Sequence, residues 1–124
     1  MDDSIRIDDG TVTITDNVIA NIAIIAAEEI ENVVRISKNV TATITDIFTN
    51  KKQAQGVKVE TEQGEVSIDI SLELVYGCKI EEVATKVQSN IKYNVESMTG
   101  LSVKEVNVVI TGLVADKNTL DKIN

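Results

Sequence analysis

Histidine is absent from this sequence of 124 residues, and cysteine occurs only once, as Cys78. Without an imidazole, the chain has no base for an ordinary histidine-dependent triad and no imidazole ligand for a metal ion. One cysteine forms neither a zinc cluster nor an internal disulfide, which fits a reducing compartment. Cys78 lies beside Lys79 before a predicted helix, but no histidine can serve it as a base. We therefore interpret it as a small residue that fills a turn.

Basic residues are few, and long apolar runs are missing. The 12 Lys and Arg residues stand against 20 Asp and Glu residues, which gives a formal net charge of -8. Such a charge repels phosphate backbones and anionic lipid headgroups. No run of about 18 apolar residues is present, and the acidic start MDDSIRIDDG lacks the apolar segment of a secretory signal. The sequence predicts a cytoplasmic protein without direct nucleic-acid binding or membrane insertion.

Aromatic residues are also scarce, with one Phe, two Tyr and no Trp. A core for this chain must therefore be built from Val, Ile, Leu and Ala, which suits a small domain of helices on a sheet. The apolar content of 43% is ordinary for a packed domain. We expect one domain over residues 1–114 and a polar, frayed C-terminal tail over residues 115–124.

The N-terminal third predicts a hairpin and a helix. Two alternating runs flank Asp9-Gly10, a dipeptide typical of tight hairpin turns. Asp16 is placed to cap a helix over residues 17–31. The apolar face of that helix comprises Ile19, Ile22, Ala23, Ala26 and Ile30.

One apolar residue of this helix falls on the polar side. Ile24 lies between Asn21 and Glu28, so these three residues form a possible partner contact. The alternative is that Ile24 is an incidental surface residue, since scattered exposed apolar side chains are common.

The middle of the chain predicts strands. Residues 33–37 read as a short strand, whereas residues 38–56 fit either a short helix or a loop. Residues 57–74 alternate around Gln63-Gly64, which predicts a long hairpin with one buried and one polar face.

A second helix is predicted over residues 80–99, followed by a strand. Its apolar stripe comprises Ile80, Val83, Val87, Ile91 and Met98, flanked by Ala84 and Val95. Gly77 and Gly100 are structural joints, and Gly100 can end the helix in the left-handed conformation. The following strand points Val106, Val108 and Ile110 inward after a crossover from the long hairpin.

These elements predict an α+β fold, a two-layer sandwich with two long helices on one face of a mainly antiparallel sheet. Catalytic, metal and cofactor sites are not predicted. Asp69 and Glu73 share a strand face but lie about 13 Å apart, and the dispersed glycines match no phosphate-binding loop. The element order also resembles KH-type RNA-binding folds, which leaves a KH-like module as a minor alternative, although the chain lacks a GXXG loop.

The sequence resembles the alkaline shock protein family of Gram-positive bacteria, also called the Gls general-stress or envelope-stress family. The resemblance covers nearly all of residues 10–113, and VQSNIKYNVESMTGLSVKEVNV is most similar to the small housekeeping-type members. The residues that show the resemblance most clearly are Val18-Ile19-Ala20, Ile22-Ala23, Tyr76-Gly77, Ile80, Val83, Gln88, Thr99-Gly100-Leu101 and Val106-Asn107-Val108. Two positions depart from the family pattern: Asn32 replaces a frequent glycine, and Val109 replaces a frequent histidine.

The resemblance implies a non-enzymatic cytoplasmic protein of cell-envelope homeostasis and stress response. It implies protein partners, self-assembly into a homo-oligomer, and membrane association only through a membrane-anchored family member. The alternative that it implies is a regulatory binding module for enzymes of fatty-acid metabolism.

Overall fold

Strand β5 (Glu65–Val75) is the centre of a four-stranded sheet in the computed structural model, which describes residues 4–7, 9–37 and 56–115. Strand β6 (Ser102–Val114) runs parallel to β5 along one edge. The other edge is shared by two antiparallel strands. Strand β4 (Val57–Glu62) pairs with residues 65–70, and β3 (Val33–Ile36) pairs with residues 72–74. The predicted hairpin with its Gln63-Gly64 turn is therefore confirmed.

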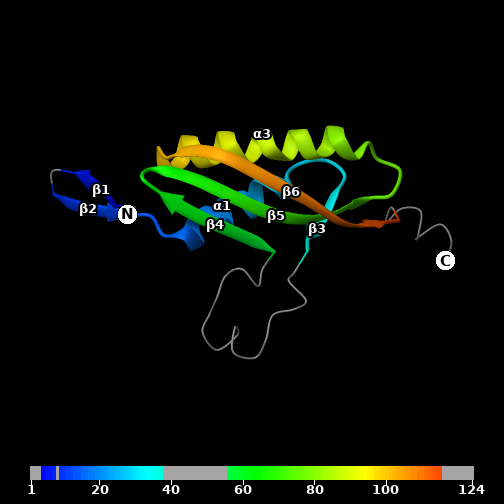
Figure 1. The fold of residues 1–124 in the computed structure, drawn as a ribbon, viewed down its shortest axis with the longest axis horizontal. Coiled ribbons are helices and arrows are strands. Elements are labelled where there is room, and N and C mark those ends of the chain that lie inside the picture. Colours follow the sequence, from blue (N-terminus) through cyan, green and yellow to red (C-terminus); the bar gives the residue numbers. More distant parts are fainter. Residues whose placement is uncertain (1–3, 8, 38–55, 116–124) are drawn as a thin grey trace, which may run out of the picture.

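Two helices cover one face of this sheet (Figure 1). They are α1 (Asp16–Glu28) and α3 (Ile80–Thr99), and α3 forms the crossover between β5 and β6. Alternate residues of β5 are buried beneath them, namely Val66, Ile68, Ile70, Leu72 and Leu74. The predicted two-layer α+β fold is confirmed, and the parallel pair of β5 and β6 is the exception to its antiparallel order.

A separate hairpin precedes the sheet. Strand β1 (Ser4–Ile7) pairs antiparallel with β2 (Gly10–Thr13), and Ile7 is opposite Gly10. Figure 1 shows this hairpin standing away from the sheet and its helices. All four residues of β2 are exposed, so this strand adds little to the core.

The start of α1 corrects one prediction. Thr15, not Asp16, is the N-cap, and its side chain accepts from the Val18 N–H at 3.4 Å. Asp16 begins the helix and accepts a hydrogen bond from the Thr61 hydroxyl at 2.9 Å, which ties α1 to β4. The helix also ends at Glu28 rather than at residue 31, and the chain turns at Asn32 with φ 79°.

The bounds of α3 agree with the prediction, but its buried stripe differs at both ends. Ile80, the first residue of the helix, lies outside the row of buried positions and is 41% exposed. Met98 is 67% exposed, and the buried residue is its neighbour Thr99. The buried positions follow steps of four, from Val83 through Val87, Ile91 and Val95 to Thr99. A row of i+4 positions is inclined to the helix axis, so it leads away from Met98.

The ends of the predicted domain lie partly outside the described residues. Strand β6 ends at Val114, and residues 116–124 of the predicted tail are not described. The predicted helix or loop over residues 38–56 is described only at Gly56. The division into a domain and a tail stays a prediction.

Candidate protein-interaction surfaces

The sheet face opposite the helices is open to solvent. It is formed by alternate residues of three strands, among them Ser67 and Asp69 of β5, Lys58 and Glu60 of β4, and Asn107 of β6. These side chains are exposed or half-buried, as the alternation predicted. We call this surface the outer sheet face.

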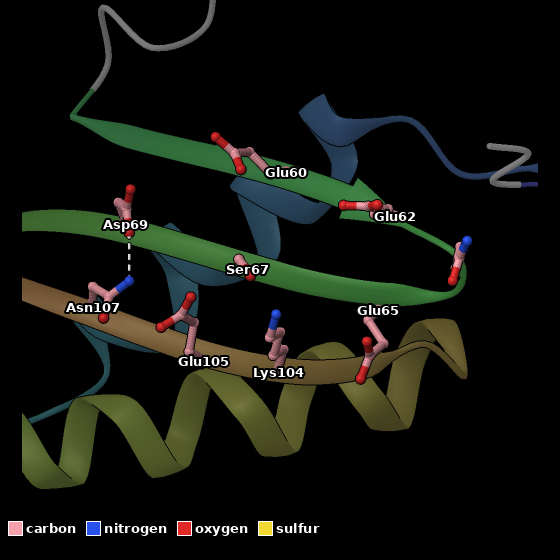
Figure 2. A pocket seen from close by; sticks show the side chains of 9 residues that line it. Glu60, Glu62, Glu65, Ser67, Asp69, Lys104, Glu105 and Asn107 are labelled. Atoms are coloured by element: carbon pink, nitrogen blue, oxygen red, sulfur yellow. Dashed lines mark hydrogen bonds between the residues drawn. The ribbon is translucent and has the colours of Figure 1, made fainter.

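One half of the outer sheet face is acidic. A shallow depression there is lined by Glu60, Glu62, Gln63, Glu65, Ser67, Asp69, Lys104, Glu105 and Asn107. Figure 2 shows these side chains rising from the three strands, with Asn107 Nδ2 donating to Asp69 Oδ1 at 2.8 Å. The depression therefore contains five carboxylates and one lysine. This surface attracts cationic groups and repels anionic ones.

The acidic half lacks the geometry of a metal centre. Among the described residues, no three His, Cys, Asp or Glu side chains come close enough to hold one ion. Glu60 is also engaged in an ion pair with Lys58 at 3.1 Å. Long-range attraction of a basic partner is the chemistry that this arrangement supports.

The other half of the outer sheet face has no uncompensated charge on β5 and β6. Arg35 Nε and Glu73 Oε1 form an ion pair at 3.3 Å, and Ser37 and Thr111 join their hydroxyls by a hydrogen bond. Residues 106–114 contain no charged side chain. Val109 points outward and is 52% exposed.

A second candidate surface lies on α1. Asn21 and Glu28 are exposed, as the predicted partner contact requires. Ile24 is half-buried and packs against the core, so its predicted place on the exposed stripe is wrong. The exposed apolar residue is Ile25, at 60%, and Val18, about two turns before it on the same side of the helix, is 44% exposed.

Two alanines of α1 explain why Ile24 is half-buried and Ile25 is exposed. Ala20 and Ala27 are buried beside the larger isoleucines, which widens the buried arc of α1 toward Ile24. Ile25 then lies on the far side with Asn21 and Glu28. The two alanines were the sequence signal that could have placed Ile25 on the surface.

The remaining predicted residues have structural roles. Gly100 ends α3 with φ 77°, and its N–H donates to the Glu96 carbonyl at 3.0 Å. Gly77 has φ 98° in the turn between β5 and α3. Cys78, a half-buried free thiol in the same turn, packs against the core.

Comparison with known proteins identifies the family. Residues 4–115 match a protein family that is described as having a cell envelope-related function. The chain belongs to this family. The match confirms the resemblance to the alkaline shock and Gls general-stress proteins.

Two bacterial relatives are similar over most of this chain. YqhY of Bacillus subtilis is 35% identical over 107 residues, which cover 86% of this chain and 79% of YqhY. A stress response regulator gls24 homolog of Streptococcus pyogenes is 27% identical over 105 residues, which cover 84% of this chain and 59% of that protein.

Solved structures show the same fold at low identity. A variant of the MamM CTD has a TM-score of 0.51 and 10% identity, and the alignment covers 81% of this chain and all of that one. At this identity the likeness concerns the arrangement of helices and strands alone. In the described part of this family member, neither helix is both long and apolar enough to cross a bilayer.

Proposed function

We propose that this protein acts without catalysis in cell-envelope homeostasis and stress response, through binding to protein partners and to copies of itself near the membrane. The cell envelope-related function of the family and the gls24 homologs supports the setting. The main support for action through protein binding is the open outer sheet face, a broad polar surface with an acidic half.

Several features of the described residues favour binding over catalysis. The polar side chains of the outer sheet face lie on an open surface and not in an enclosed pocket. Its carboxylates lie beside lysine, serine and asparagine, with no histidine in the chain to act as a base. A rigid sheet that presents fixed charges is suited to recognising a complementary protein surface.

We further propose a cytoplasmic location with membrane association through a membrane-anchored protein. The net charge of -8 opposes direct contact with anionic lipids. A membrane-anchored partner with a basic segment facing the cytoplasm is the counterpart that the acidic half of the outer sheet face fits.

A cross-linked pull-down of the tagged protein from its host tests this function, with membrane and soluble fractions analysed separately by mass spectrometry. Recovery of the protein itself with a membrane protein is the expected result. A matched bait carrying Glu60→Lys and Glu105→Lys should lose the partner if the acidic half binds it. A soluble lipid-synthesis enzyme as the dominant catch would favour the regulatory alternative, and no enriched protein would overturn both roles.

A further inference from the structure

The edges of the four-stranded sheet differ in how well they are protected. Both edges of β5 are occupied, whereas β3, β4 and β6 each leave one edge without a described strand. Strand β3 has four residues and includes Arg35, and β4 has six residues and includes Lys58, Glu60 and Glu62. Short length and charged side chains are the usual means by which an edge strand avoids pairing with another chain.

The first part of β6 is protected by α3. The Val103 N–H donates to Glu96 Oε2 at 2.9 Å, and Gln88 Nε2 donates to the Val106 carbonyl at 3.0 Å. Two side chains of the helix thus occupy backbone groups at this end of the strand. In Figure 1, α3 runs beside the first part of β6 and then diverges from its second part.

The second part of β6 has no such protection. Beyond Val106, no side chain of the described residues hydrogen-bonds to the backbone of this strand. Residues 106–114 form a run of nine without a charge, in a chain of which 26% is charged and which has no proline. Val109 on the outer sheet face and Leu113 on the helix side are 52% and 45% exposed. An uncharged, exposed edge of high β-propensity is a site for strand pairing.

We propose that residues 106–114 of β6 pair with the same residues of a second copy of this chain, antiparallel about a two-fold axis. The proposal rests on the proposed function and names the surface through which self-association takes place. Pairing joins two four-stranded sheets into one and covers Val109 and Leu113 of both copies.

Charge distribution favours a second copy as the occupant. Two chains of charge -8 repel each other, so the contact requires a surface where neither brings carboxylates. Residues 106–114 meet this condition, and the nearby Glu73 is neutralised by Arg35. The carboxylates Glu62 and Glu65 lie at the opposite end of β5, where Glu65 pairs with Ser102 at the start of β6. Antiparallel pairing therefore places Glu62 and Glu65 of the two copies toward the far ends of the joined sheet.

Sedimentation velocity over a wide concentration range is the first test. The unmodified chain should form a dimer as its concentration rises. Val109→Lys, which brings two like charges to the axis, should weaken the dimer about tenfold or more. Ile25→Lys is the matched control, because it removes an exposed apolar side chain and adds the same charge on α1. A monomer at every concentration, or equal weakening by both substitutions, overturns the proposal.

Two further measurements test the proposal without the Val109→Lys variant, so a folding defect in that variant does not affect them. Amide hydrogen exchange of the unmodified chain should slow in residues 106–114 as concentration rises, and not in β4. In a Cys78→Ser background, a mixture of the Val109→Cys and Thr111→Cys chains, whose positions face each other in this register, should form a covalent dimer on mild oxidation, and Lys58→Cys on β4 should not. Exchange that does not depend on concentration, or cross-linking at position 58 alone, contradicts the assignment to β6.

The two proposals fail separately. If Val109→Lys is monomeric but still recovers a membrane protein in the pull-down, both the edge proposal and partner binding stand. If the unmodified chain never dimerises yet recovers that partner, the edge proposal fails and the proposed function keeps its binding role.

Discussion

The backbone at Gly100 enters the left-handed region where α3 ends. A Cβ built on Gly100 would meet no atom within 4 Å, so a substitution there tests backbone conformation without steric overlap. Gly100→Val is expected to lower the free energy of unfolding by about 1 kcal/mol or more, because a β-branched residue is strained at this φ. Urea unfolding measures the change.

Gly100→Asn is the matched control, since asparagine tolerates the left-handed conformation at a helix end. It should lose clearly less stability than the valine variant. A valine variant with an unchanged urea midpoint would show that the cap conformation adds nothing to stability.

Two adjacent isoleucines of α1 differ in burial and should differ in their response to a charge. Ile24 packs against the core, whereas Ile25 is 60% exposed. Ile24→Asp should lower the melting temperature because it places a carboxylate against apolar side chains. Ile25→Asp should change the unfolding free energy by no more than about 0.5 kcal/mol. Thermal unfolding of the two variants measures the difference, and the reverse order would contradict the burial described for α1.

At the scale of elements, Asn90 connects the two helices. Its side-chain amide on α3 donates to the Ala26 carbonyl of α1 at 2.7 Å and to Glu29 Oε1 at 3.0 Å. Ala26 lies in the last turn of α1, where carbonyls have no partner within the helix. Asn90 therefore caps α1 from a neighbouring element, and no basic residue lies in that turn.

Asn90→Ala should lower the free energy of unfolding by about 1 kcal/mol and speed amide exchange at the end of α1. Ser89→Ala on the exposed face of α3 is the control and should change neither quantity appreciably. Equal effects of the two substitutions would show that the interhelical hydrogen bond contributes nothing.

Most elements could be predicted because their signals are local. The alternation of residues 66–74, the turn at Gln63-Gly64 and the helix end at Gly100 each follow from side-chain period or glycine conformation. The exposure of Met98 could not be read from α3 alone, because it depends on how the helix crosses the sheet. The hydrogen bonds from Gln88 to Val106 and from Asn90 to Ala26 join residues 18 and 64 positions apart, so no local sequence pattern predicts them.

At the scale of the whole molecule, the β1–β2 hairpin is separable from the sheet. An isolated two-stranded hairpin is marginally stable in water, and the residues of β2 are exposed. Removing residues 1–13 while keeping Ile14, which packs against the core, should leave the melting temperature nearly unchanged. Amides of β1 and β2 should also exchange much faster than those of β5 in the full chain. A large loss of thermal stability on truncation would show that the hairpin supports the core.

At this scale, charge is distributed unevenly over the surface of the molecule. The acidic half of the outer sheet face suits a basic partner, and the uncharged end of β6 suits another copy. The two contacts adjoin at Asn107, which lines the acidic depression and belongs to residues 106–114. Salt should weaken the first contact and strengthen the second, since it screens attraction and repulsion alike.

The β3 and β4 strands meet at one residue of β5. The Ser37 N–H donates to the Ser71 carbonyl, and the Ser71 N–H donates to the Gly56 carbonyl. A Cβ at position 56 would lie 1.8 Å from the Ser37 oxygen, so glycine permits this approach. The chain thus leaves the sheet at Ser37 and rejoins it at Gly56 at the same point. A reporter domain whose own termini lie close together therefore suits insertion between Ser37 and Gly56.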